Sequence, residues 1–250
     1  GTLDDQFAPQ PFTGYVAGLH TLSNGEVLVG GNQSEINGFQ VPIFSRLFAG
    51  GPVDPSFLGS HSVTGFEAGV LQMETDSLGR IYASGWFILT NSTEWVNLAR
   101  FDSNGELDDT FPKLEGYISG QEVLPNGKVL VSGDFSPMDD GRHIFIARYD
   151  PDGTEDSTFN VPSSVSDVMA MAVQADQKIL VAQSSNLVRL LPDGAIDPSF
   201  KFDYEVPGIQ QILARADGRI LVSGWFGNVK GFPRNGIAQF LTNGILDSEF

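Results

Sequence analysis

A five-residue motif returns six times along the chain and divides it into units of similar length. An aliphatic residue, Asp, two variable residues and Phe occur as LDDQF, VDPSF, LDDTF, IDPSF and LDSEF, which end at Phe7, Phe57, Phe111, Phe200 and Phe250. A sixth copy, EDSTF, ends at Phe159 and has Glu155 at the aliphatic place. Successive copies are 41 to 54 residues apart. Self-similarity at such a period indicates a repeat architecture in which each repeat is one supersecondary unit.

Two hairpin signals lie inside every unit. The first is a turn followed by an apolar, largely β-branched run, as in SNGEVLVGG (23–31), PNGKVLVSGDF (125–135) and ADGRILVSGWF (216–226). Asn-Gly or Asp-Gly before such a run predicts a β-hairpin. The second hairpin joins segments such as ARYDPDG to the Asp-x-x-Phe motif. Two hairpins give four strands per unit, and in the first unit we expect them near 16–22, 26–31, 42–48 and 52–57.

The register of the second hairpin follows from its turn. A type I turn with Gly in the left-handed position of a bulge places residues eight apart directly opposite each other. The resulting pairs are Arg46–Asp54, Arg100–Asp108, Arg148–Asp156, Arg189–Asp197 and, in the last unit, Gln239–Asp247. We interpret the four charged pairs as repeated ion pairs within a sheet, each contributing about 0.2–1 kcal/mol if it is exposed.

Four-stranded units at this period predict an all-β fold, a β-propeller of five four-stranded units that forms one domain over residues 1–250. The units end near 57, 111, 159, 200 and 250, and we expect them to close into a five-bladed ring. A solenoid fits less well, because its repeats are usually shorter. Residues 1–7 form a strand-4 remnant of a preceding unit, for which a closed five-bladed ring has no place. The remnant is either an extra outer strand or tail, or the sign of a longer array.

Three motifs together carry a family resemblance. The patterns [DN]-G-[KR]-[IV]-L-V-x-G, R-[LFY]-x-x-[DN]-G and [LI]-D-x-x-F resemble the delta-60 repeat, a bacterial β-propeller repeat family, from end to end of the chain. The resemblance implies a propeller within a large secreted or surface-attached protein, and it supplies no catalytic residues. The fourth unit departs most, with Gln177 in place of the turn Gly and a deletion after its second strand.

Charge and composition exclude several partners. The net charge is −17, and the 14 Lys and Arg residues form no run, so the chain lacks the basic face that nucleic acid requires. The same charge is repelled by anionic lipid, and no run of about 18 apolar residues is present to insert into a membrane. The chain has no Cys, which excludes disulfides, thiolate metal sites and Cys nucleophiles.

The connections between strands 2 and 3 vary most between units and fall on one rim of the ring, where a rigid scaffold usually carries its binding residues. Aromatic residues gather there, next to amides and acids, a combination that suits sugar rings. The ligand-binding candidates on this rim are Trp86, Trp95, Phe135, Arg142, His143, Trp225 and Phe232. In the competing interpretation, Trp86, Phe135 and Trp225 fill the core between blades.

Evidence for other chemistry is weak. Asp150, Asp152 and Asp156 surround a Gly as in a calcium loop, but the Gly comes too early and no Glu follows at position 12. Asp134, Asp139 and Asp140 are rim acids among which nothing selects a catalytic pair. We therefore expect a non-catalytic binding or display module without a cofactor, located outside the cell or on its surface as part of a larger multidomain chain. Its ligand would be a glycan or a protein; a glycoside hydrolase and a structural spacer are the alternatives.

Overall fold

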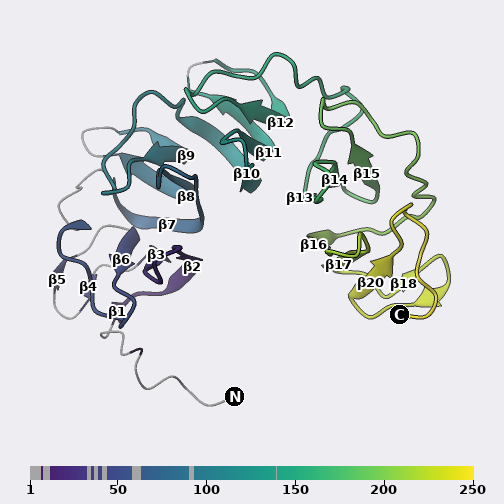
Figure 1. Cartoon of the computed structure of the whole chain (residues 1–250), viewed down its shortest axis with the longest axis horizontal. Helices are drawn as coiled ribbons and strands as arrows, with labels where there is room; N and C mark the ends of the chain where they lie inside the picture. Colours follow the sequence, from purple (N-terminus) through teal and green to yellow (C-terminus); the bar gives the residue numbers. More distant parts are fainter. Residues whose placement is uncertain are drawn as a thin grey trace.

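A computed structural model describes residues 7, 12–32, 35–36, 39–40, 44–57, 63–89, 93–138 and 140–250. These residues form antiparallel sheets and turns, and none of their elements is an α-helix. No helix in this part of the chain could therefore span a membrane. Five three-stranded units, here called blades 1 to 5, follow one another along an arc in sequence order (Figure 1), and one pairing, of Leu114 with Leu98, joins blades 2 and 3 into a six-stranded sheet. The all-β propeller architecture predicted from the repeats is confirmed.

Each blade has three paired strands, the first nearest the centre of the arc (Figure 1). Blade 1 contains β2 (Val16–Thr21), β3 (Val27–Gly31) and β6 (Phe44–Leu47); blade 2, β7 (Val63–Thr75), β8 (Ile81–Leu89) and β9 (Trp95–Phe101); blade 3, β10 (Leu114–Val123), β11 (Val129–Pro137) and β12 (Ile144–Tyr149); blade 4, β13 (Ala170–Val173), β14 (Ile179–Ala182) and β15 (Leu187–Leu190); and blade 5, β16 (Ile209–Ala214), β17 (Ile220–Gly224) and β20 (Ile237–Phe240). Short strands β1 (Phe12–Thr13), β4 (Glu35–Ile36), β5 (Phe39–Gln40), β18 (Asn228–Val229) and β19 (Phe232–Pro233) form two small additional sheets.

The expected fourth strand is reduced to one bridge in every unit, so the prediction of a strand at 52–57 was wrong. The bridges join Leu47 to Val53, Phe101 to Leu107, Tyr149 to Glu155, Leu190 to Ile196 and Phe240 to Leu246. The chain leaves the ladder at the following Asp, because that residue closes a turn. In blade 1 the Asp54 carboxylate accepts a hydrogen bond from the Ser56 backbone N–H at 2.9 Å, and the Asp54 carbonyl accepts one from Phe57 at 3.2 Å.

The predicted register of this hairpin is confirmed in all five blades. The turn Gly of each has a positive φ, between 87° and 98°, and each motif Asp donates its backbone N–H to the carbonyl of the residue eight positions earlier. The side chains meet as well: Arg46–Asp54, Arg100–Asp108, Arg148–Asp156, Arg189–Asp197 and Gln239–Asp247 are joined at 2.7–2.9 Å. The ion pairs are more buried than expected, because each Arg is also covered by the Phe that ends the motif.

The same arginines connect each blade to the next one. Each guanidinium donates from its Nη1 atom to a backbone carbonyl in the turn of the following blade. The acceptors are Ser103 for Arg46, Pro151 for Arg100, Pro192 for Arg148 and Thr242 for Arg189, at 2.5–2.9 Å. Each Arg therefore lies at the centre of a unit made of its own Asp, its own Phe and a neighbouring turn.

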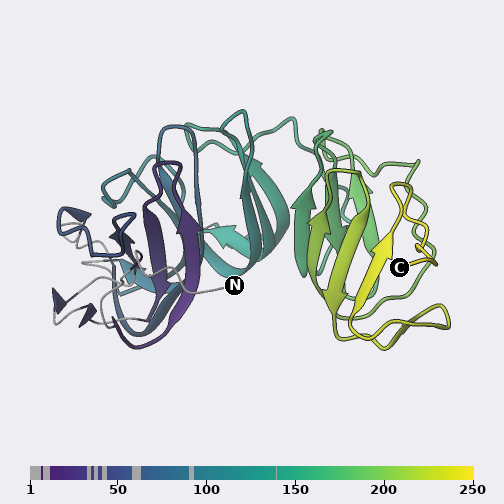
Figure 2. The same cartoon turned by 60° about the horizontal axis from the view of Figure 1, so that its bottom comes forward.

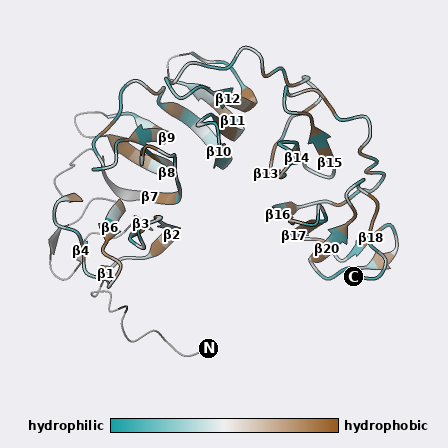
Figure 3. Ribbon diagram, in the orientation of Figure 1, coloured by the Kyte–Doolittle hydropathy of each residue, from teal (hydrophilic) through white to brown (hydrophobic). Residues whose placement is uncertain are grey.

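The hydrophobic core lies between the blades. We call the face of each sheet that points toward the following blade its forward face and the opposite face its back face. At each of the four contacts between successive blades, a forward face packs against a back face. Leu98 and Tyr82 on the forward face of blade 2, for example, form one cluster with Val129, Val131 and other back-face residues of blade 3. Apolar residues accordingly concentrate on the strands and polar residues on the connections (Figure 3).

The ring is open, so the predicted closure was wrong. Among the described strands, those of blade 1 pack principally against blade 2 and those of blade 5 against blade 4, and a gap separates the two end blades in both views (Figures 1 and 2). Four contacts between successive blades thus hold the five blades in an open arc. The extra motif copy, at residues 3–7, lies outside the described residues except for Phe7.

Candidate functional site

One end of the strand 1–strand 2 hairpin presents a large side chain beside a small or polar one in four blades. At this level Gly69 pairs with Trp86 in blade 2, and Tyr117 pairs with Asp134 in blade 3. At the equivalent positions the Asn32 backbone N–H donates to the Tyr15 carbonyl in blade 1, and the Trp225 N–H donates to the Gly208 carbonyl in blade 5. The register of blade 4 places Ser184 at the position of Trp86. The rim therefore carries one exposed aromatic side chain at this level in each of four blades: Tyr15, Trp86, Tyr117 and Trp225.

Trp86 is directed outward by a bulge at Gly85. A Cβ atom on Gly85 would lie 2.0 Å from the carbonyl oxygen of Gly69 on the neighbouring strand, so only glycine allows the two strands to approach this closely. The ladder shifts register here, and Trp86 is 49% exposed while Phe87, the next residue, is buried. Each side of the strand thus has its own role, with Phe87 in the core and Trp86 on the surface.

Trp86 and Tyr117 face a cleft between blades 2 and 3. The cleft has a volume of about 330 Å³ and is lined by Gln72, Ser84, Trp86, Asn97, Tyr117 and Ser119, among others. Tyr117 is 48% exposed, so the site offers two aromatic rings together with amide and hydroxyl groups. None of the described residues that line it is acidic. We call it the aromatic cleft.

Asn97 holds the two walls of the aromatic cleft together. Its side chain is buried; its Nδ2 atom donates to the carbonyl of Gly85 at 2.8 Å, and its Oδ1 atom accepts from the backbone N–H of Gly116 at 3.0 Å. These two bonds fix the residues next to Trp86 and Tyr117. The spacing of the two rings is therefore set before any ligand arrives, which lowers the entropic cost of binding.

Tyr15 extends the row of aromatic residues into blade 1. Its hydroxyl lies within 3.6 Å of the position that a Cβ on Gly69 would occupy, and Gly69 is the paired neighbour of Trp86. Tyr15, Trp86 and Tyr117 thus come from three successive blades. Sequence reasoning missed both tyrosines because they lie on strand 1 rather than in the variable connections. The signal in the sequence was that blade 2 has Gly69 paired with Trp86, whereas blade 3 has a Tyr and an Asp at the same two positions.

The structure divides the predicted rim residues into separate groups. Trp95 lies on blade 2, and its neighbours Val96 and Phe87 both enter the back-face core, so Trp95 and Trp86 project from the opposite, forward face. On blade 3, His143 contacts the Asp134 carboxylate at 2.8 Å, and Arg142 pairs with Asp140 and Glu155. Trp95, Arg142 and His143 are not among the residues that line the aromatic cleft.

The remaining predicted rim residues do not join this group. Trp225 is 80% exposed and Phe232 is also exposed, but both belong to blade 5. Phe135 is only 2% exposed and packs between blades 2 and 3, so it is a core residue and not a surface contact. The reason is strand alternation, because Phe135 is the blade 3 equivalent of the inward-facing Phe87.

The three calcium candidates are engaged by protein groups. Asp156 accepts hydrogen bonds from Arg148, Lys128 and Thr158, and Asp150 pairs with Lys128 at 2.8 Å. Asp152 accepts from the backbone and side chain of Thr154. A cation at this place would have to displace the Lys128 ammonium group, so the geometry favours a hairpin stabilised by ion pairs.

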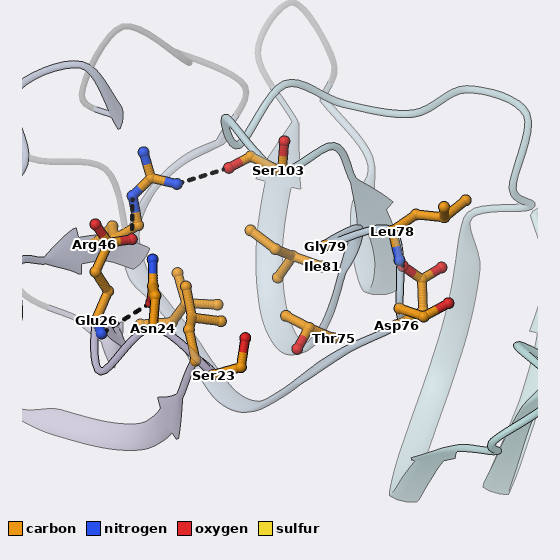
Figure 4. A pocket seen from close by; sticks show the side chains of 13 residues that line it. Ser23, Asn24, Glu26, Arg46, Thr75, Asp76, Leu78, Gly79, Ile81 and Ser103 are labelled. Carbon is orange, nitrogen blue, oxygen red and sulfur yellow. Dashed lines mark hydrogen bonds and ion pairs between the residues drawn. The ribbon is translucent and has the colours of Figure 1, made fainter.

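A larger cavity of about 610 Å³ lies between the turns of blades 1 and 2 (Figure 4). Arg46 spans its edge to the carbonyl of Ser103. Its two carboxylates are paired with cations, Glu26 with Arg46 at 3.6 Å and Asp76 with Arg80 at 2.6 Å. This cavity therefore belongs to the network that connects the blades.

Two glutamates lie on neighbouring inner strands. Burial and the nearby Glu122 carboxylate raise the pKa of Glu74 to about 7, and burial also raises the pKa of Glu122. A carboxyl whose pKa is raised on folding stabilises the fold below its unfolded pKa, and this stabilisation is lost as the pH rises through the folded pKa.

We therefore compare the free energy of unfolding of Glu74→Gln with that of the unmodified chain. The difference should rise in favour of Glu74→Gln by about 1–2 kcal/mol from pH 5 to pH 8, because the amide carries no charge to bury. Urea denaturation at the two pH values measures this gain. Glu106→Gln, in an exposed turn, is the matched control and should change little at either pH. An equal effect of Glu74→Gln at both pH values would contradict the assignment.

Comparison with known proteins supports the fold. A family model described as a domain of unknown function (DUF5122) β-propeller matches residues 22–57, 79–111, 124–159, 174–200 and 215–250, once in each unit. No curated protein matches the sequence. The matched repeats cover strands 2 and 3 and the Asp-x-x-Phe motif of each unit.

Several solved structures are similar at low sequence identity. PorZ, a surface component of the type-IX secretion system of Porphyromonas gingivalis, aligns with a TM-score of 0.57 and 12% identity over 94% of this chain and 33% of its own. YCF48 bound to a D1 peptide gives 0.55 and 13%, over 96% and 70%. The extracellular domain of BT4673 from B. thetaiotaomicron gives 0.53 and 11%, over 92% and 28%. The chain thus spans about a third of PorZ, and these identities support the fold alone. Through its five repeat matches, the chain belongs to the DUF5122 β-propeller family.

Proposed function

We propose that the chain is a non-catalytic binding module of a secreted or cell-surface bacterial protein, and that it holds a glycan in the aromatic cleft. The observation that carries this proposal is the half-exposure of Trp86 and Tyr117 on the two walls of one cleft. The apolar C–H faces of a sugar ring stack on aromatic side chains, while its hydroxyls bond to amides and hydroxyl groups. Gln72 and Ser119 supply such groups beside the rings.

The surroundings of the cleft fit binding better than catalysis. Glycosidases need two carboxyl groups on either side of the bond that is cleaved. Asp134 is engaged by His143, Asp140 by Arg142, and Asp139 lies outside the described residues. A spacer has no need for exposed aromatic side chains at the same level of four blades, since exposing such groups to water is costly. These points support a binding module over a glycoside hydrolase or a structural spacer.

A location outside the cell is part of the proposal. PorZ is described as a bacterial surface component, and the aligned part of BT4673 belongs to its extracellular domain. YCF48, which has the same fold, was solved with a bound peptide. A protein ligand is therefore the second candidate, and a screen should include both classes.

The first experiment is a glycan array probed with the labelled chain and with Tyr117→Ala. We expect binding to a limited set of glycans, and a loss of at least about tenfold in affinity for Tyr117→Ala, because its ring lines the cleft and its stacking surface is removed. The variant should remain folded, since Tyr117 is 48% exposed. Mass spectrometry of each glycan after long incubation should find it intact. Shortened products would favour the hydrolase, and the absence of any bound glycan would favour a protein ligand or the spacer.

A further inference from the structure

The forward face of blade 5 carries several exposed apolar side chains. Ile237 of β20 is 42% exposed, and Phe250, at the end of the last motif, is 46% exposed. Leu213 on the inner strand of the same blade is also exposed. This face of blade 5 is turned away from blade 4 (Figures 1 and 2).

The equivalent residues of the other blades show what covers such a face. The register places Phe44, Leu98, Ile146 and Leu187 at the position of Ile237, and all four are at most 7% exposed. Phe57, Phe111 and Phe159 stand at the position of Phe250 and are at most 9% exposed. In each case the covering surface is the back face of the following blade.

Blade 4 gives the best match to blade 5. Its forward face carries Leu180, Leu187 and Phe200, where blade 5 carries Leu221, Ile237 and Phe250. The leucines of blade 4 are covered by Ile209, Ile220, Val222 and Ala238 of blade 5. Two faces with nearly the same side chains fit the same covering surface, because interblade packing depends on shape and apolar area.

We propose that the forward face of blade 5 binds a further blade of this repeat type through the contacts that blades 1 to 4 already make. The partner surface must offer aliphatic residues at two alternate positions of its second strand and a small residue on its third. The exposed face is the continuation of four interfaces within the chain, and this continuity identifies the occupant.

A second copy of this chain does not offer that surface. Blade 1 is the end blade whose back face could do so, and its residues at the required positions are Val27, Val29 and Ser45. Val29 and Ser45 are at most 1% exposed in this chain and Val27 is partly buried, so this surface is already covered. The occupant is therefore an additional repeat unit rather than blade 1 of another molecule.

Gln239 is the residue of blade 5 that stands closest in position to the turn of a further blade. It stands where the other blades have the Arg that reaches the next turn, and its amide bonds to Asp247 at 2.8 Å. An amide is shorter than a guanidinium and has fewer donors. Replacing Gln239 by Arg should therefore gain most when a following turn is present to accept the extra hydrogen bond.

The test adds a second copy of residues 201–250 directly after Phe250 of the full chain. In this fusion we expect hydrogen exchange in β17 and β20 of the original blade 5 to slow by about tenfold, and the unfolding midpoint to rise. The matched control carries Val222→Asp and Ala238→Asp in the added copy only, which places charges on its back face. Gln239→Arg in the original blade should raise the midpoint more in the fusion than in the chain alone.

Two results would overturn the proposal. If the fusion and its Asp control exchange at the same rate in β17 and β20, the face does not bind a blade of this type. If the unfused chain is a dimer by light scattering and Ile237→Asp makes it a monomer, the occupant is a second copy. A monomeric chain with slower exchange only in the unmodified fusion is the result that we expect.

Discussion

Replacing Arg100 by alanine should lower the free energy of unfolding by about 3–5 kcal/mol, the range for breaking a buried ion pair by removing one partner. Arg100 is 1% exposed. Its guanidinium donates to Asp108 at 2.7 Å, to Thr110 at 2.7 Å and to the Pro151 carbonyl of blade 3 at 2.8 Å, and it lies 5.0 Å from the Phe111 ring. The substitution removes all of these contacts and opens a cavity between two blades.

Arg142→Ala provides the contrast in the same urea denaturation experiment. Arg142 also makes two ion pairs, but it is exposed, so its removal should cost only about 0.5 kcal/mol. Arg100→Lys should recover only part of the loss, since an ammonium group lacks the planar fork of donors. Equal small losses for Arg100→Ala and Arg142→Ala would contradict the role that we assign to the buried arginines.

Acidification from pH 6 to pH 3 should unfold the chain. Burial acts to raise the pKa of Asp54, Asp156 and Asp197, but hydrogen bonds from Ser or Thr two residues later and from the paired cations outweigh it and lower the pKa below its usual value. A carboxyl whose pKa is depressed by folding stabilises the fold above its unfolded pKa. This contribution is lost as the pH falls below about 4 towards the folded value.

Circular dichroism and intrinsic fluorescence during an acid titration measure this loss. The transition should begin below about pH 4. Added salt should weaken these buried ion pairs less than it weakens exposed ion pairs. Asp197→Asn should be less stable than the unmodified chain at pH 6, with a smaller difference at pH 3, because the Asp197 carboxyl of the unfolded chain is by then largely protonated. A chain equally stable at pH 3 and pH 6 would contradict the account.

Local features of this fold could be predicted from the sequence. One turn type fixes the pairing of Arg148 with Asp156, because the positive φ of Gly153 and the bulge leave a single register. The length of the fourth strand could not be predicted, since it ends where Asp156 bonds to Thr158 instead of continuing the ladder. Ring closure depends on the angle between blades, which is set by side-chain packing over long sequence distances.

The binding surface, too, could be predicted from the sequence only in part. Trp86 could be found because it stands out among equivalent positions, whereas the alternative that placed it in the core is corrected by its exposure. Phe135 was assigned to the wrong side of its strand, since the bulge that separates surface from core cannot be located from residue types alone. Tyr117 could be recognised as a partner of Trp86 only after the blades were placed beside each other.

The central claim, that the aromatic cleft binds the ligand, is tested most directly by calorimetric titration of the best glycan from the array. Trp86 and Trp225 occupy equivalent positions after a bulge, and both are exposed, but only Trp86 lines the cleft. The account predicts that the unmodified chain and Trp225→Ala bind the glycan with the same affinity and a stoichiometry of about one, and that Trp86→Ala loses at least about tenfold in affinity. Equal affinity for Trp86→Ala and the unmodified chain, or a loss confined to Trp225→Ala, would contradict it.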